Sequence, residues 1–391
     1  MAAIDTPVSS DPIEVARALA PRIRASADDI EQARQLPDWL VRELRDAGIF
    51  RMYLPRALGG LEADPLTMMR AIEELACADG STGWCVMIAN QNAYFTTSVE
   101  AEAAAEIGGP DTIVASSAKP AGRAIAVDGG YSVSGRWPYA SGVTHATWVF
   151  GNCEVYDGET PRVGENGRPV VRAVWLPASA VEVLDTWRTT GLRGTGSHDF
   201  AVVDVFVPER RSFRFFLEPP RLPGPLYRVP ALMWALQGSH ALGIARRAIE
   251  ALVELAAGKT PAFTSTVLRE QQHAQEQVGR ATALVAAARL YLEDATRGLW
   301  DTVAAGDEPT MAQRACVRQA AGHAASSARE AVALMYQTGD SSSIHTALPL
   351  DRCWRDVTTA ATHVGVRDRG FLAAGRLTLG LELDATTAFG I

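Results

Sequence analysis

The spacing of apolar residues over the first 110 positions follows the three-to-four-residue period of amphipathic helices. One helix should start at Asp64-Pro65, because aspartate suits the N-cap and proline suits the first helical position. Gly48 stands where the C-cap of an earlier helix belongs. We therefore predict an N-terminal helical domain over residues 1–110, with helices over 13–30, 37–47, from 65 onward and over 81–107.

The pattern changes after Gly108-Gly109-Pro110 to short β-prone runs separated by Gly, Pro and Asn. Asp128-Gly129-Gly130 lies between two such runs, and Asp-Gly in this position is a strong hairpin signal. We expect residues 111–222 to form a middle β-domain, a compact antiparallel barrel or sandwich. Its strands should cover 113–118, 125–127, 131–133, 147–156, 170–176, 181–187 and 200–207.

From Pro230 onward the chain is again periodic like a helix and is rich in alanine, which allows helices to approach closely. Helical patterns this long usually pack in a bundle. We predict a C-terminal four-helix bundle over residues 223–391, which makes the whole chain an α+β protein. The four helices should cover 231–257, 265–305, 309–337 and 349–372.

Composition narrows the function classes. The 391 residues are 47% hydrophobic and 21% charged, which is ordinary for a soluble globular protein. The net charge of -8 argues against nucleic acid or an anionic membrane as a partner, and no apolar run is long enough to cross a membrane. Five scattered cysteines form no C-x-x-C pair, so we expect neither a disulfide framework nor a metal site. Without a signal-peptide pattern at its start, we expect a cytoplasmic protein.

The last predicted helix carries a polar stripe. At about 100° per residue, Arg352, Asp356, Thr359, His363 and Arg367 fall on one side of it. Considered alone, such a stripe is typical of a solvated face. The motifs elsewhere in the chain change this interpretation.

Residues 135–142, Gly-Arg-Trp-Pro-Tyr-Ala-Ser-Gly, follow the predicted hairpin. Together with residues 128–131 they resemble the flavin-contacting strand of the acyl-CoA dehydrogenase superfamily, and its flavin-dependent monooxygenase branch has a similar Trp-x-x-x-Ser-Gly run. The resemblance is chemically reasonable, because Trp137 would offer a flat apolar surface to the flavin ring and Ser141 a hydroxyl near its N5 atom.

The resemblance extends over almost the whole chain and implies a set of cofactor contacts. Residues 115–120 look like the loop that enters the flavin site, and 190–197 resemble the second signature of the middle domain. Residues 268–270 resemble the entry to the long bundle helix, where an arginine reaches the flavin of a neighbouring subunit, and 336–339 resemble a contact to the flavin tail. The implied cofactor-binding residues are Ser116, Ser117, Trp137, Tyr139, Ser141, Arg269, Gln337, Thr338 and Gly339.

The branch of the family depends on one position. Acyl-CoA dehydrogenases resemble one another in carrying a carboxylate base after an Arg-Asp pair, just before a glycine. Counted from Arg355-Asp356, that position is Val364, and His363 stands beside it. Glu250 is a weak alternative base. A histidine here is typical of the monooxygenase branch, which the chain therefore resembles more.

That branch implies the oxygenase component of a two-component system, which uses O2 and FMNH2 or FADH2 through a flavin C4a-hydroperoxide to hydroxylate an aromatic or polycyclic substrate. His363 would accept or hold a phenolic proton. Ser116 and Ser141 would stabilise the peroxide. Asn90 stands where related oxygenases often have a pocket-facing histidine. The candidate catalytic residues are thus His363, Ser141, Ser116 and Asn90.

Three alternatives remain open: an N- or S-oxygenase of the same family, an FAD-dependent acyl-CoA dehydrogenase, and a flavin-free scaffold. The chain has no room for an NAD(P)H-binding domain, so the oxygenase interpretation implies a separate NAD(P)H:flavin reductase. The resemblance also implies a homotetramer that shares each flavin site between subunits. The small-molecule aromatic substrate, the atom that is oxidised and the choice between FMN and FAD are not determined by these motifs.

Overall fold

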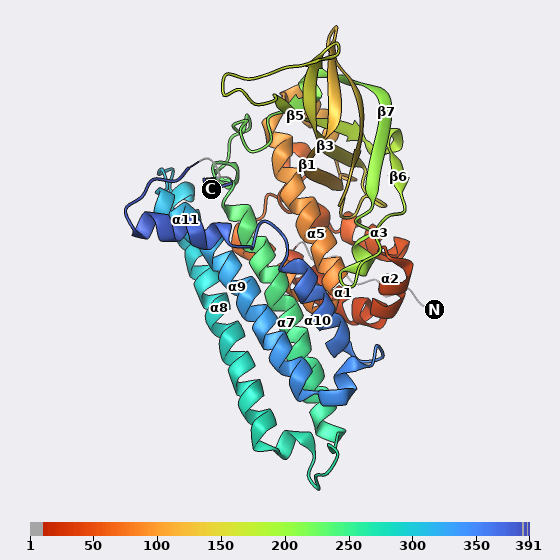
Figure 1. Cartoon of the computed structure of the whole chain (residues 1–391), viewed down its shortest axis with the longest axis vertical. Coiled ribbons are helices and arrows are strands. Elements are labelled where there is room, and N and C mark those ends of the chain that lie inside the picture. The colour runs from red at the N-terminus through yellow and green to blue at the C-terminus, as the bar shows by residue number, and fades with distance from the viewer. Residues whose placement is uncertain (1–10, 385–386, 389) are drawn as a thin grey trace.

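The computed structural model describes residues 11–384, 387–388 and 390–391. A sheet occupies one end of the molecule, long helices extend away from it, and shorter N-terminal helices lie alongside (Figure 1). The predicted α+β order of helical domain, β-domain and helical bundle is confirmed.

The predicted helix cap at Asp64 is confirmed, and a second aspartate, Asp79, caps the helix that was expected to begin at residue 81. Asp64 accepts the backbone N–H of Thr67 at the start of α4, and Asp79 accepts that of Thr82 at the start of α5. The helix predicted over 81–107 is interrupted by a 3-10 turn at Tyr94–Ser98. The six α-helices are α1 Pro12–Ala25, α2 Ala27–Ala33, α3 Asp38–Asp46, α4 Pro65–Ala78, α5 Gly80–Ala93 and α6 Ala101–Ile107.

The predicted hairpin is confirmed, since Val127 lies opposite Gly130 in an antiparallel ladder. However, the strands form one open sheet instead of a closed barrel or a sandwich, and β1 and β3 are parallel. The order is β6-β7-β2-β1-β3-β5-β8, with β4 beside β3. The strands are β1 Val114–Val127, β2 Gly130–Trp137, β3 Trp148–Asp157, β4 Thr160–Pro161, β5 Val171–Pro177, β6 Glu182–Leu184, β7 Asp199–Pro208 and β8 Ser212–Phe213.

The parallel pair has a simple topological cause. Strand β2 lies on one side of β1, and the connection over residues 138–147 crosses to the other side before β3 begins. Because β3 then runs in the direction of β1, the two pair in parallel. The predicted flavin motif continues into this connection, so Ser141 lies beyond the end of the sheet strand.

The bundle differs from its prediction in the last helix. The segment predicted as one helix over 349–372 is two helices, so the polar stripe ends at Thr359, and His363 and Arg367 lie in the connection after it. A Cβ on Gly365 would overlap the Oε1 of Gln237, which shows how closely this connection approaches α7. The bundle helices are α7 Leu232–Gly258, α8 Gln272–Ala304, α9 Met311–Thr338, α10 Pro349–Ala360 and α11 Arg369–Thr378.

One core joins the N-terminal helices to the bundle, and a second core lies within the sheet domain. Helix α5 contacts α7, α10 and β1, so it lies where the two cores meet. Helix α7 is almost completely buried over its first half. Among the helices that the structure describes, none combines the length and the apolar character needed to span a bilayer.

Candidate active site

A cavity of about 500 Å³ lies at the junction of α5, the sheet, the start of α7 and the connection between α10 and α11. Its volume falls in the range of small-molecule sites. Aromatic side chains from all three domains contribute to its walls: Trp84, Phe95, Tyr139, Trp187, Phe215, Phe216 and Trp234. No aspartate or glutamate is among the described residues that line it.

His363 lines this cavity, and its contacts determine which ring nitrogen carries the proton. Its Nδ1 atom lies 3.1 Å from the backbone N of Gly365 and 2.9 Å from Nε2 of Gln237. Both are N–H donors, so Nδ1 must accept and cannot carry a proton. The proton of the neutral ring is therefore on Nε2, which makes no hydrogen bond within the described part of the chain.

The orientation of the Gln237 amide follows from a second glutamine. Gln91 donates its Nε2 to the carbonyl of Met233 at 2.8 Å, which turns its Oε1 toward Gln237. The Nε2 of Gln237 then lies between two acceptors, Gln91 Oε1 at 3.4 Å and His363 Nδ1 at 2.9 Å. A flipped amide would place two oxygens against each other, so the network determines the tautomer of His363.

Burial lowers the pKa of His363 to about 4, and the positive charge of Arg318 contributes in the same direction. The edge of the Trp84 ring packs against the imidazole, with 5.5 Å between ring centroids. His363 is consequently a neutral ring at physiological pH that presents an N–H donor at Nε2.

A chain of hydroxyl groups forms another edge of the cavity. Thr195 donates to the carbonyl of Leu192 at 2.8 Å, so its oxygen accepts from Ser197 at 2.7 Å. The Ser197 oxygen in turn accepts from Ser141 at 2.7 Å, and the Ser141 oxygen accepts from Trp84 Nε1 at 2.9 Å. Each of these three hydroxyl groups therefore already donates its proton to the next acceptor in the series. Ser141 can therefore offer a ligand a lone pair but not a proton.

Five predicted site residues, Ser116, Ser117, Tyr139, Ser141 and His363, come together in the lining of this cavity. They arrive from β1, from the connection after β2 and from the connection after α10. The hydroxyl of Ser116 donates to Asn92 Oδ1 at 2.8 Å, so it also faces a ligand as an acceptor.

Trp137 does not lie where it was predicted. Its side chain is completely buried in the core of the sheet domain, stacked on Phe200 with 4.9 Å between ring centroids, and its Nε1 donates to the carbonyl of Asn152. The last residue of β2 points its side chain into the sheet core, and a flat wall of the cavity comes instead from Trp84 and Trp187.

Asn90 also lies outside the cavity lining. Its amide donates to the carbonyls of Ile49 and Val86, both at 2.8 Å, and its oxygen accepts the backbone N–H of Tyr53. With these bonds the side chain has no free group for a ligand. Helical rotation places the next residue, Gln91, and then Asn92 at the cavity instead.

The segment that joins α7 to α8 and the C-terminal end of α9 lie at the end of the bundle farthest from the sheet (Figure 1). Arg269 belongs to the first of these segments, and Gln337, Thr338 and Gly339 lie at the end of α9. Lys259 donates to the carbonyl of Gly339 at 2.6 Å, which holds this end together. None of these four lines the cavity of its own chain. Their contact to a neighbouring subunit's flavin stays a prediction.

Sequence reasoning missed Gln91 and Gln237 as site residues. Gln91 belongs to a polar run, Asn90-Gln91-Asn92, within an apolar helix, but the spacing does not show which of the three side chains faces a cavity. Gln237 is a polar residue that is 3% exposed within a largely apolar helix segment. A buried glutamine in such a segment is the signal that could have identified it.

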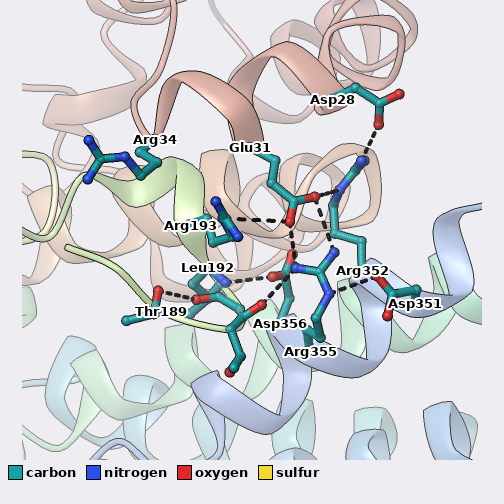
Figure 2. Close-up of polar contacts among 12 residues, drawn as sticks. Asp28, Glu31, Arg34, Thr189, Leu192, Arg193, Asp351, Arg352, Arg355 and Asp356 are labelled. Carbon is teal, nitrogen blue, oxygen red and sulfur yellow. Dashed lines mark hydrogen bonds and ion pairs between the residues drawn. The ribbon is translucent and has the colours of Figure 1, made fainter. Parts of the chain in front are cut away.

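The loop over residues 189–197 is clamped onto α10 (Figure 2). Leu192 has a left-handed backbone with φ of 50°, and its N–H donates to Asp356 Oδ1 at 2.6 Å. Arg355 donates to the carbonyl of Thr190 at 2.7 Å. A Cβ on Gly191 would overlap the carbonyl of Arg355, so only glycine allows this contact. The hydroxyl chain that begins at Leu192 is thus positioned by α10.

Asp356 makes folding stability depend on pH. Burial, together with the nearby Asp79 carboxylate, raises its pKa to about 7. Since the ordinary pKa of aspartate is about 4, the stability provided by the protonated group is complete below pH 4 and is lost as the pH rises to about 7.

Asp356→Asn keeps an acceptor for the Leu192 N–H but removes the ionisation. Between pH 5 and pH 8 the free energy of unfolding of the variant should rise relative to the wild type, by on the order of 2 kcal/mol. Urea unfolding at the two pH values measures this difference. Equal pH dependence of the two proteins would contradict the prediction.

The residues around the cavity fit a flavin. The aromatic walls suit a flat ring, and the lone pairs of Ser116 and Ser141 suit the N–H groups that a reduced ring carries. By contrast, the described residues contain no group of three or more His, Cys, Asp or Glu side chains that could hold a metal ion.

Comparison with known proteins agrees with this fit. Residues 13–103 match the N-terminal domain and 235–368 the C-terminal domain of acyl-CoA dehydrogenase. The chain is 32% identical to indole-3-acetate monooxygenase of Pseudomonas putida, over 92% of both chains. It is 30% identical to the flavin-dependent monooxygenase oxygenase subunit HsaA of Mycobacterium tuberculosis, over 93% of this chain and 94% of HsaA.

A solved structure resembles the whole fold. XiaF from Streptomyces, in complex with FADH2 and glycerol, is 28% identical and superposes with a TM-score of 0.87, over 95% of this chain and 96% of XiaF. At this coverage the similarity extends over all three domains.

Proposed function

The chain belongs to the acyl-CoA dehydrogenase family, in its flavin-dependent monooxygenase branch, and on this premise we propose that it hydroxylates an aromatic or polycyclic substrate as the oxygenase component of a two-component system. It is an oxidoreductase that uses reduced flavin, FMNH2 or FADH2, with O2 as co-substrate. One observation carries the assignment within the family: the cavity presents a neutral histidine, and none of the described residues that line it is a carboxylate.

The missing carboxylate argues against the dehydrogenase alternative. Removal of the α-proton of a thioester needs a base at the ring, and Val364 stands at the corresponding position. The weak alternative, Glu250, pairs with Arg24 at 2.7 Å and does not line the cavity. A well-formed cavity with converging polar groups also argues against a flavin-free scaffold.

Reduced flavin, when bound, activates O2 and supplies the oxygen atom that reaches the substrate. The role of the chain is to hold the reactants and exclude water. Trp84, Trp187 and Trp234 cover the cavity with apolar surface. Ser141 Oγ accepts a ligand N–H. Its hydrogen bonds to Ser197 and Trp84 orient the Ser141 hydroxyl so that a lone pair faces the ligand.

His363 Nε2–H donates a hydrogen bond to an oxygen in the cavity, such as a substrate hydroxyl. Both roles predicted for this residue, accepting a phenolic proton or holding it by a hydrogen bond, need a lone pair at Nε2. The contacts at Nδ1 instead support a donor that holds a substrate oxygen and orients the ring. A base at Nε2 would require the other tautomer, with a proton on Nδ1 that faces two N–H groups.

The proposal includes the partners. A name such as "oxygenase subunit" for the relatives implies a second component, and we propose a separate NAD(P)H:flavin reductase for this chain. The positions of Arg269 and Gly339 at the free end of the bundle support a homotetramer in which this end reaches a neighbouring flavin. The five scattered cysteines of the chain are free thiols, which supports a location in a reducing compartment, the cytoplasm.

The function is tested by anaerobic titration with FMNH2 and FADH2, followed by exposure to O2 and a panel of phenols and indoles. Reduced flavin should bind more tightly than oxidised flavin, because Ser141 and Ser116 face the ring as acceptors. O2 consumption should match hydroxylated product, and released H2O2 accounts for any difference. Failure to bind either reduced flavin, or bleaching of a bound oxidised flavin by acyl-CoA, would contradict the proposal.

A further inference from the structure

A second pocket, with a volume of about 740 Å³, lies on the other side of the loop 187–197. Three arginines, Arg34, Arg188 and Arg193, and five threonines line it. The Asp185 carboxylate accepts hydrogen bonds from Arg34 and Arg188, whereas Arg193 donates to no carboxylate of the described residues. Figure 2 shows Arg34 and Arg193 near Thr189 in this region. A lining of guanidinium and hydroxyl groups is suited to an oxyanion.

The two pockets are neighbours. Thr359 and Thr362, in the turn before His363, line both of them. The loop 187–197 also faces both, with Trp187 and Leu192 toward the active-site cavity and with its two arginines toward the second pocket. Thr359 and Thr362 thus border both pockets, and the arm of a ligand whose ring lies in the cavity would have to pass these two threonines to reach the arginine pocket.

Arg193 keeps donors for such an arm. It makes no hydrogen bond with any described residue, and its buried Nε lacks a hydrogen-bond partner. Its ion pair with Glu31 is long, at 3.9 Å, because Glu31 already accepts bonds from Arg352 and Arg355. Arg34, in contrast, is held by both carboxylate oxygens of Asp185.

Arg193 belongs to a segment whose backbone is held by hydrogen bonds before any ligand binds. Arg193 begins the 3-10 turn Arg193–Thr195, directly after Leu192, whose N–H is held by Asp356. The clamp of Arg355 on Thr190 holds the other side of the loop. The backbone at Arg193 is therefore already fixed, and only its side chain must become ordered when it binds an anion.

Size gives a reason for an arm outside the cavity. A volume of about 500 Å³ suits one ligand of ordinary size, whereas the reaction brings a flavin ring and a substrate together. We propose that the arginine pocket is an oxyanion subsite that binds the phosphate or carboxylate arm of a ligand whose ring occupies the active-site cavity. The proposal rests on the proposed function. Two sources share this chemistry, the flavin phosphate and an acid group of the substrate.

Arg193→Met tests the subsite, with two ligand pairs that differ by one anion. The first pair is reduced FMN and reduced riboflavin, and the second is indole-3-acetate and indole, each titrated anaerobically by fluorescence. If the flavin phosphate binds there, the variant should bind reduced FMN about tenfold more weakly and riboflavin unchanged. If the substrate acid binds there, the loss of about tenfold should appear for indole-3-acetate and not for indole.

Two further variants make the test specific. Arg188→Met removes a more exposed cation of the same pocket and should give a smaller loss for the same ligand pair. Arg136→Met, on β2 outside both pockets, is the matched control and should change neither pair. The subsite is refuted if Arg193→Met leaves the affinity for both anionic ligands unchanged. It is also refuted if the variant weakens the binding of the neutral ligand of each pair as much as that of the anionic one. Failure of the wild type to bind either reduced flavin would instead refute the proposed function, and the indole pair would still test the subsite.

Discussion

His363→Ala is expected to lower the rate of hydroxylated product formation by about 100-fold or more, while the affinity for reduced flavin stays close to that of the wild type. The imidazole presents the Nε2–H donor in the active-site cavity, and its loss leaves a substrate oxygen without a partner that holds it. O2 should still be consumed, and H2O2 should replace the hydroxylated product. Chromatography of the product and an H2O2 assay measure the two outcomes.

His363→Gln is the matched control. A glutamine amide can place an N–H donor near the position of Nε2, so this variant should recover part of the activity lost in the alanine variant. The activity of the wild type, like that of this variant, should not depend on a group with a pKa near 6.5, because the wild-type imidazole stays neutral down to about pH 4. Wild-type rates in the alanine variant would remove His363 from the mechanism. If the alanine variant lost affinity for reduced flavin to the same extent as activity, the role of His363 would be structural.

Gln237→Glu should have the second largest effect. A carboxylate 2.9 Å from Nδ1 accepts a proton instead of donating one, so it stabilises Nδ1–H and raises the pKa of His363. In the neutral ring Nε2 then carries a lone pair instead of a proton, so the substrate loses its hydrogen-bond donor. We expect a 10- to 100-fold fall in product formation, on the order expected for a misplaced catalytic proton.

Gln237→Leu separates the tautomer from simple packing. Leucine removes the amide donor but adds no acceptor, and the N–H of Gly365 still opposes a proton on Nδ1. The leucine variant should therefore lose less activity than the glutamate variant. Nitrogen-15 NMR of the imidazole should show Nδ1 unprotonated in the wild type and protonated in Gln237→Glu. The same tautomer in both proteins would contradict our explanation.

Much of the fold could be predicted because its signals are local. The carboxylate of Asp64 caps the helix that begins at Pro65, and Asp128-Gly129-Gly130 makes the tight turn between two strands, both within a few residues of sequence. The parallel pairing of β1 and β3 could not be predicted, because it depends on where the connection over residues 138–147 crosses the sheet.

The candidate site was predicted less completely, and the errors share one cause. Family resemblance identified Ser116, Ser141 and His363, which do converge on the cavity. It also indicated Trp137 and Asn90, but each lies one or a few positions from the side chain that reaches the cavity. In a strand or helix a shift of one residue changes the direction of the side chain, and a motif does not give that direction.

The amino-acid sequence by itself determined the three-part architecture, the helix start at Pro65 and the presence of His363 and Val364 where the resemblance expects a carboxylate. Only the tertiary structure decided what His363 can do. Helix α10 ends at Ala360, so the imidazole leaves the predicted polar stripe and meets Gln237 from a helix more than a hundred residues earlier. Protonation states depend on the donors that surround a group in space, and those donors are brought together by folding.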